Sequence, residues 1–464
     1  MLTYDLDKRG NKTMYEYLYE LIKEDIADGK LKADEKLPSK RGLSQHLQIS
    51  VKTVENAYEQ LLLEGYIRSE EKRGYYVNKI AVVTGGAPGY AAPVKRFQEE
   101  TYLADLTANN IRYDRFPFAT WAKVMRETLT DYNTSLLRTV PFNGVLQLRE
   151  AIADHLNRYR GMQVSADHII IGAGTEYLYN RLLQLLGPDV KFGVENPGYR
   201  KITKIYDENG VDWDYVNIDD KGMKVDELRM KDINVAHVSP EHHFPIGLVM
   251  PVARRQELLN WAAEESGRYI IEDDFDCEFR MQGKPIPSMQ SRDRSHRVIY
   301  MNTFSRTLTP TIRISYMVLP PHLAATYQEK LDFYACTVSN FEQYALAAFI
   351  EEGYFEKHLN RMRLYYTKQR EAVLSVLKEE PFKCVGRVRE ADSGLHFILE
   401  LNTLLSDNEV KRKLEAEGIH INALSEYYHN NTDEYSHSFV ISYSDMKIEN
   451  FKIACSKMSK LTPL

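Results

Sequence analysis

The chain has 464 residues, which is too long for one ordinary hydrophobic core, so we expect two or three domains. Its hydrophobic share of 43%, charged share of 27% and net charge of −6 are typical of a soluble globular protein. No apolar run approaches the roughly 20 residues that span a bilayer, and the amino terminus lacks the apolar core of a signal peptide. These features exclude a membrane partner and make the cytoplasm the expected location.

The cysteines argue against a metal site. Cys277, Cys336, Cys384 and Cys455 are scattered, with no Cys-x-x-Cys pair. This spacing favours a reducing compartment, and we expect no zinc and no other bound metal.

The first eighty residues have the pattern of helices followed by a hairpin. Apolar residues recur at helical spacing over 13–28, and Gly29 predicts the end of this helix. Ser39 is the expected N-cap of a second helix and Ser50 that of a third. The apolar face of this third helix consists of Val54, Ala57, Tyr58 and Leu61. Two short runs flank a polar tip within 66–77 and predict a β-hairpin.

This order of elements predicts a winged helix-turn-helix over 1–79, whose third helix would place its N-terminal end in the major groove of DNA. The segments 37–41, 49–54 and 64–67 resemble the pattern of the GntR family of regulators. The resemblance implies a double-stranded DNA operator as partner. The residues that we expect to face DNA are Lys40, Arg41, Ser50, Lys52, Thr53, Lys72 and Arg73.

The charge of this region predicts weak DNA binding by a single copy. Residues 1–79 carry 14 Lys plus Arg and 14 Asp plus Glu, whereas neutralised phosphates supply most of the affinity of a protein for DNA. Paired half-sites occupied by a dimer would therefore be needed. The family often has arginine directly after the capping serine, and this chain has Val51. A module that makes only protein contacts is the alternative.

Residues 80–100 predict a flexible linker. Three glycines and two prolines lie between Val82 and Pro93, and this composition disfavours regular structure. The rest of the chain, 101–464, alternates apolar strands with amphipathic helices, which predicts an α/β sheet domain.

A glycine-rich turn follows an early strand of this second domain. Residues 168–172 predict the strand, and Gly172-Ala173-Gly174-Thr175-Glu176 leads into a helix over 177–186. Backbone N–H groups at a helix N-terminus can hold a phosphate. Such turns are common in α/β proteins, so the motif alone leaves its ligand open.

Further segments resemble fold-type I aminotransferases, which use pyridoxal 5′-phosphate (PLP). They are 194–199, 239–247, 269–276 and 300–320, and they follow the family order. The resemblance implies a PLP-dependent transferase-like fold with a mainly parallel sheet and a smaller C-terminal α+β subdomain at about 355–464. With the winged helix in front, the whole chain resembles a MocR-type regulator, the GntR subgroup that carries an aminotransferase-like domain.

The resemblance assigns roles in a cofactor site. Asp273 would pair with the protonated pyridine nitrogen, the charge that makes PLP an electron sink, and Tyr199 would stack on the ring. The residues implied around the phosphate are Gly174, Thr175, Thr303, Ser305 and Arg313.

The chain also departs from the aminotransferase pattern. Arg306 stands where the family has the lysine that holds the cofactor as a Schiff base, and a protonated guanidinium has no nucleophilic lone pair. Phe275 replaces the tyrosine that bonds the cofactor's 3′-oxygen, and Thr139 aligns with a phosphate-binding tyrosine from the partner subunit. The arginine that holds the substrate carboxylate is absent near Glu426. We therefore expect no catalytic residues and no transamination. Lys201 is the neighbouring amine that could in principle replace the missing Schiff-base lysine, so this interpretation requires that it does not.

We interpret the chain as a DNA-binding transcriptional regulator whose aminotransferase-like domain senses a small effector. PLP or a related phosphorylated compound, bound non-covalently beside Arg306, is one candidate ligand. The other is a cationic or polar ligand selected by Glu426, His242 and His243, in a site that no longer takes PLP. Because Phe275 departs from the family as well, natural divergence is favoured over an engineered change at position 306.

The resemblance implies a head-to-tail homodimer. Closure of the effector domain around its ligand would change the spacing of the two DNA-binding modules, which requires the ligand to prefer one closure state. Two alternatives remain open: an active PLP-dependent aminotransferase with a DNA-binding appendage, and a constitutive dimeric DNA-binding protein with a vestigial effector domain.

Overall fold

The computed structural model describes residues 2–79, 102–107, 112–280, 286–389, 394–429 and 435–462. The chain divides into two compact units, Met1–Glu99 and Glu100–Leu464. The linker predicted at 80–100 lies outside the described residues.

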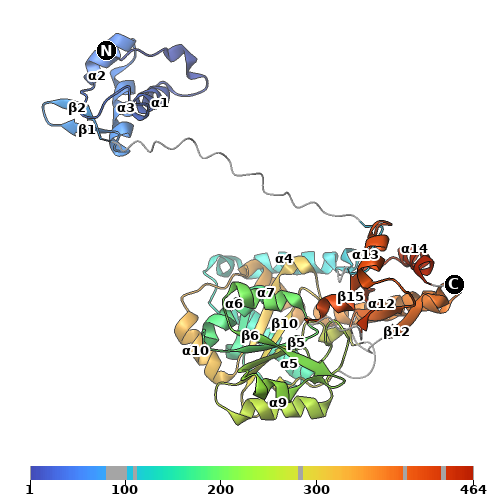
Figure 1. Ribbon diagram of the computed structural model, residues 1–464. Helices are drawn as coiled ribbons and strands as arrows, with labels where there is room; N and C mark the ends of the chain where they lie inside the picture. The colour runs from blue at the N-terminus through green and yellow to red at the C-terminus, as the bar shows by residue number, and fades with distance from the viewer. Residues whose placement is uncertain are drawn as a thin grey trace. The chain divides into compact units, whose positions relative to one another are not determined.

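The N-terminal unit has the predicted order of helices and hairpin (blue in Figure 1). Its elements are α1 (Met14–Ala27), α2 (Lys40–Leu47), α3 (Val51–Leu63), β1 (Ile67–Glu70) and β2 (Gly74–Val77). Both expected caps are present, because Ser39 Oγ accepts a hydrogen bond from the Gly42 N–H and Ser50 Oγ accepts one from the Thr53 N–H. Between these helices Gln48 adopts the left-handed conformation, with φ 57°, and turns the chain.

The apolar face predicted for α3 is the core of this unit. Val54, Ala57, Tyr58 and Leu61 are all buried, and they pack with Leu18 and Ile22 of α1. The Tyr58 hydroxyl donates a hydrogen bond to the carbonyl of Pro38 at 3.0 Å. This bond joins α3 to the segment that precedes α2, and so fixes the two helices of the helix-turn-helix.

The larger unit is built on a mainly parallel sheet, as predicted. Its described strands form one sheet in the order β4-β11-β10-β9-β8-β5-β6-β7. Strands β10, β9, β8, β5 and β6 run parallel, whereas β11 is antiparallel to both of its neighbours and β7 is antiparallel to β6. The strands are β4 (Ile169–Ala173), β5 (Phe192–Asn196), β6 (Trp213–Asp219), β7 (Gly222–Met223), β8 (Val235–Val238), β9 (Tyr269–Asp273), β10 (Val298–Thr303) and β11 (Ile314–Val318).

Helices cover both faces of this sheet. Successive residues of a strand point to opposite faces, and in β9 Ile270 packs in the cluster that includes α8 and α9 whereas Ile271 packs in the cluster that includes α6, α7 and α10. Both residues are fully buried, as expected for a covered parallel sheet. The helices of this part are α4 (Phe118–Asp131), α5 (Leu146–Arg160), α6 (Thr175–Leu186), α7 (Arg200–Glu208), α8 (Val225–Met230), α9 (Val252–Glu264), α10 (Pro321–Leu331) and α11 (Asn340–Glu351).

The C-terminal elements gather at one side of the larger unit (orange to red in Figure 1), and four of their strands form a second sheet in the order β12-β13-β16-β15. They are α12 (Tyr354–Lys378), β12 (Gly386–Arg389), β13 (His396–Leu401), α13 (Asp407–Glu415), β14 (Ile419–His420), β15 (Asn422–Ala423), β16 (Ser438–Ser442) and α14 (Ile448–Met458). One pairing was not predicted from the sequence. Strand β3 (Ala104–Asp105) runs parallel to β14, so the segment before the main sheet also joins the C-terminal part.

Across the described residues, we find no helix with both the length and the apolar composition that a membrane crossing requires.

Candidate functional site

A cavity of about 460 Å³ lies where the parallel strands end. Asp273 is the last residue of β9, Thr303 is the last residue of β10, and Gly174 follows β4 directly. Ligands of open α/β sheets bind outside the carboxyl ends of the strands. The residues predicted for the cofactor site all line this one cavity: Gly174, Thr175, Tyr199, Asp273, Phe275, Thr303, Ser305, Arg306 and Arg313.

Asp273 keeps one carboxylate oxygen unused. The Tyr179 hydroxyl donates to Oδ2 at 2.7 Å, and Nε2 of His237 lies 3.7 Å from the same oxygen. The Tyr206 hydroxyl lies 2.9 Å from Nδ1 of His237 and so holds the imidazole ring of His237 in place. Asp273 Oδ1 is buried and has no hydrogen-bond partner in the described part of the chain. Since Asp273 lines the cavity, this oxygen could accept a ring N–H of a ligand.

Arg313 and the glycine-rich turn form a cradle that could hold an anion. Arg313 adopts φ 50°, in the left-handed region that is uncommon for residues other than glycine. A Cβ on Gly174 would lie 2.2 Å from Nη2 of Arg313, so only glycine allows this approach. Thr175 is the first residue of α6, and N–H groups at a helix N-terminus favour negative charge. Ser305 Oγ is buried without a partner among the described residues.

A side-chain carboxylate already occupies this cradle. Nη2 of Arg313 donates to Oε2 of Glu176 at 2.7 Å, and Lys201 forms a close ion pair with Oε1 of the same residue. All three side chains line the cavity. Although partial burial opposes it, hydrogen bonds from Lys201 and Arg313 lower the pKa of Glu176 to about 2. Glu176 is therefore ionised at neutral pH.

Arg306 lies on an aromatic wall of the cavity. Its guanidinium carbon is 6.0 Å from the centroid of the Phe275 ring, which is a cation–π distance. Phe244 extends the wall, with ring centroids 6.0 Å from Tyr199 and 5.2 Å from Tyr427. Phe244 and Tyr427 line the cavity and were not predicted from the sequence.

Glu195 also lines the cavity, and its carboxyl is mainly uncharged at neutral pH. This residue is 8% exposed, and its Oε2 accepts a hydrogen bond from the Ser239 N–H at 3.1 Å. Burial raises the pKa of Glu195 to about 8, so that the carboxyl is mainly protonated at pH 7.

The residues that we considered as alternative ligand-selecting groups lie outside the cavity lining. His242 is buried, with Nδ1 3.0 Å from Oδ2 of Asp276, and His243 is buried beside it. Glu426 pairs with Lys411 at 2.6 Å and accepts the N–H of Ala423 at 2.9 Å. His396 lines the cavity in their place, where no sequence motif pointed to it.

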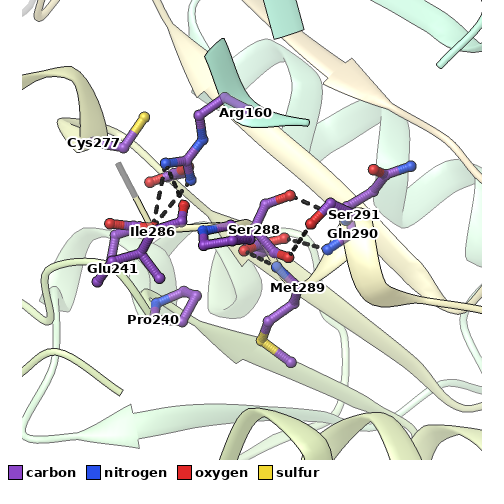
Figure 2. A network of polar contacts seen from close by, with 12 residues as sticks. Arg160, Pro240, Glu241, Cys277, Ile286, Ser288, Met289, Gln290 and Ser291 are labelled. Carbon is purple, nitrogen blue, oxygen red and sulfur yellow. Dashed lines mark hydrogen bonds and ion pairs between the residues drawn. The ribbon is translucent and has the colours of Figure 1, made fainter. Parts of the chain in front are cut away.

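A buried polar network lies next to Asp273. Arg160, the last residue of α5, donates to Oδ2 of Asp274 at 2.6 Å, to Oε1 of Glu241 at 3.2 Å and to the carbonyl of Ile286 at 2.9 Å. Figure 2 shows the Arg160 guanidinium facing Glu241 and Ile286. Asp274 follows the candidate ring partner directly in the chain. Arg160 therefore joins the end of β9 to the segment that leads to Phe244.

No sequence motif singled out Arg160, because a basic residue in the last turn of a helix is ordinary. Only the tertiary structure places two carboxylates against it.

The residues predicted to face DNA lie at the N-terminal ends of α2 and α3 and at the tip of the hairpin. Ser50 caps α3, and its Oγ is 2.8 Å from Oγ1 of Thr53. Glu55 bridges two of the predicted DNA-facing side chains, with Oε1 3.0 Å from Nζ of Lys40 and Oε2 2.9 Å from Nζ of Lys52. The structure thus brings both lysines to one face, and their contact with DNA stays a prediction.

A winged helix-turn-helix followed by an aminotransferase-like α/β domain is the domain organisation of a DNA-binding transcriptional regulator with an aminotransferase-like second domain. The family model "Bacterial regulatory proteins, gntR family" matches residues 14–77, and "Aminotransferase class I and II" matches residues 102–458. The chain belongs to the gntR family, in the subgroup with an aminotransferase class I and II domain that is named MocR-type.

Relatives of the full two-module length support this assignment. The uncharacterized HTH-type transcriptional regulator YdeL of Bacillus subtilis (strain 168) is 37% identical over 94% of each chain. The HTH-type pyridoxine biosynthesis transcriptional regulator PdxR of Corynebacterium glutamicum is 30% identical over 89% of this chain and 88% of its own. Among solved structures, an archaeal alanine:glyoxylate aminotransferase is similar to this chain with a TM-score of 0.66 and 24% identity, over 77% of this chain and 90% of that chain. That likeness shows the fold.

Proposed function

We propose that the protein is a cytoplasmic, DNA-binding transcriptional regulator whose aminotransferase-like domain binds a phosphorylated ring compound without covalent attachment. PLP and its close relatives are the first candidates. The observation that carries the proposal is the composition of the cavity, which has the acceptor Asp273 and the cradle at Arg313 but Arg306 where a Schiff-base lysine would stand.

These residues fit the phosphate and the ring nitrogen of PLP and do not fit its covalent attachment. When bound, PLP supplies a protonated pyridine ring that acts as an electron sink. The unused Oδ1 of Asp273 would accept the ring N–H. Arg313, Ser305 and the N-terminus of α6 would hold the phosphate by charge-assisted hydrogen bonds. Phe275 would offer the ring an apolar contact in place of a hydroxyl.

The same residues argue against transaminase chemistry. A guanidinium group has no nucleophilic lone pair, so Arg306 can serve neither as the nucleophile nor as the base that the family's lysine provides. Lys201 is the amine in the lining that could take over, and its ammonium is held in an ion pair with Glu176. A lysine nitrogen that is engaged with a carboxylate is not available to attack a carbonyl group.

Two considerations bear on the active form of the regulator and on its effector. A single module without net positive charge needs a second half-site for tight binding, so we propose a homodimer as the active form. The name of the Corynebacterium glutamicum relative connects it with pyridoxine biosynthesis, which makes a B6 compound a reasonable effector for this chain as well.

Titration calorimetry with pyridoxamine 5′-phosphate tests the binding part of the proposal. This compound carries an amine and cannot form a Schiff base with a lysine. We expect saturable heat with the wild type and about 10- to 100-fold weaker binding by Arg313→Gln, because a hydrogen bond to a charged group is worth about 1.5–3 kcal/mol.

Arg158→Gln is the matched control, since the Arg158 side chain is 71% exposed and pairs with Asp154 at the surface. Unchanged affinity in Arg313→Gln would contradict the proposed phosphate site. A new visible absorption band with PLP that disappears in Lys201→Gln would favour the enzyme alternative instead.

A further inference from the structure

The carboxylate of Glu176 stands in the position that the cradle offers to a ligand anion. It binds both Arg313 and Lys201, and its Oε2 lies 2.8 Å from where a Cβ of Gly174 would be. Glu176 is the second residue of α6, so its side chain starts beside the helix N-terminus. The groups that attract negative charge therefore already hold one negative charge.

We propose that Glu176 is an internal competitor of the ligand, which must leave Arg313 before an anionic group can enter the cradle. This inference rests on the proposed function, because it concerns the same cavity. Glu176 would be the residue that sets the affinity of the site and its choice among anions.

The charges of the site decide which anions can compete. Exchanging the Glu176 carboxylate for a ligand carboxylate replaces one single charge with another and gains little electrostatic energy. A phosphate monoester carries close to two negative charges at neutral pH and interacts more strongly with Arg313 and Lys201. The site should thus favour a phosphate monoester over a carboxylate ligand.

Protonation cannot release Glu176 in the neutral range. Its hydrogen bonds to Lys201 and Arg313 hold its pKa at about 2 against the opposing effect of partial burial. Between pH 6 and pH 8 only another anion can take its place.

A different role for Glu176 predicts the opposite effect of its removal. If the carboxylate orients Arg313 and Lys201 for the ligand, then Glu176→Gln should weaken phosphate binding. If it competes with the ligand, the same variant should bind phosphate more tightly, because the substitution removes the negative charge and keeps the size of the side chain.

The test is calorimetry of pyridoxamine 5′-phosphate and of pyridoxamine, which lacks the phosphate, with the wild type and Glu176→Gln. We expect at least about tenfold tighter binding of the phosphorylated compound by the variant, since the phosphate then need not displace a carboxylate that is ion-paired with Arg313 and Lys201. Binding of pyridoxamine should not change. Glu208→Gln is the matched control, because Glu208 is an exposed residue at the end of α7 outside the cavity lining.

The outcomes separate this inference from the proposed function. If the wild type binds pyridoxamine 5′-phosphate and Arg313→Gln binds it more weakly, but Glu176→Gln gains nothing, the function stands and the competitor role is refuted. If only Glu176→Gln binds, the competitor role is supported and the wild type is not a sensor of this compound. If neither protein binds, both ideas are refuted.

Discussion

Arg160→Met should lower the free energy of unfolding by about 3–5 kcal/mol, because it removes the arginine that pairs with the buried Asp274 carboxylate and leaves that carboxylate buried without it. The Arg160 guanidinium lies 2.6 Å from Asp274 and 3.2 Å from Glu241, and all three side chains are almost fully buried. Methionine fills similar space without a charge. Urea denaturation followed by circular dichroism measures the loss.

A surface arginine of the same helix provides the control. Arg158→Met changes a side chain that is 71% exposed, and substitutions of this kind usually change stability by about 0.5 kcal/mol or less. Equal stability of the two variants would mean that the network is not a structural support of the site. Because Asp274 adjoins Asp273, we also expect Arg160→Met to weaken ligand binding under conditions where the protein is still folded.

Arg41→Ala should reduce operator affinity by about 30-fold or more. Arg41 lies in the first turn of α2, on the predicted DNA-facing side. A specific arginine contact to DNA is worth about 1–3 kcal/mol, and in a homodimer each operator would lose two such contacts. Fluorescence anisotropy on a duplex selected from random sequence by the wild type measures the effect.

The charge-matched control is Arg9→Ala, at the end of the short helix that precedes α1. Arg9 is exposed and is not among the residues predicted to face DNA. If Arg41→Ala and Arg9→Ala bound the operator equally well, the prediction that Arg41 faces DNA would be wrong.

Short-range signals in the sequence were sufficient for the N-terminal unit. Ser39 and Ser50 are capping residues with a local mechanism, and the buried face of α3 follows from helical spacing. The cofactor-site residues were predicted from the resemblance to aminotransferases, and several of them lie at the end of a strand of one sheet, such as Asp273 at the end of β9 and Thr303 at the end of β10.

Contacts between distant segments were not predictable in the same way. Glu176 and Lys201 lie in α6 and α7, and Arg313 directly precedes β11, so no local pattern relates the positions of these three residues. The pairing of β3 with β14 joins segments more than 300 residues apart, and each strand has only two residues. Strands this short carry no periodicity, so only the packing of the whole domain defines them.

Operator affinity in the absence and presence of pyridoxamine 5′-phosphate tests the central claim most directly. Coupling between two sites is reciprocal, so a ligand that changes DNA binding must itself be bound with a different affinity when DNA is present. We predict a change of about five-fold or more in the wild type at saturating ligand, the size of typical allosteric coupling, and a smaller change in Arg313→Gln at a ligand concentration just sufficient to saturate the wild type. An operator affinity that stays the same in the wild type, at ligand concentrations where calorimetry shows full occupancy, would contradict the account.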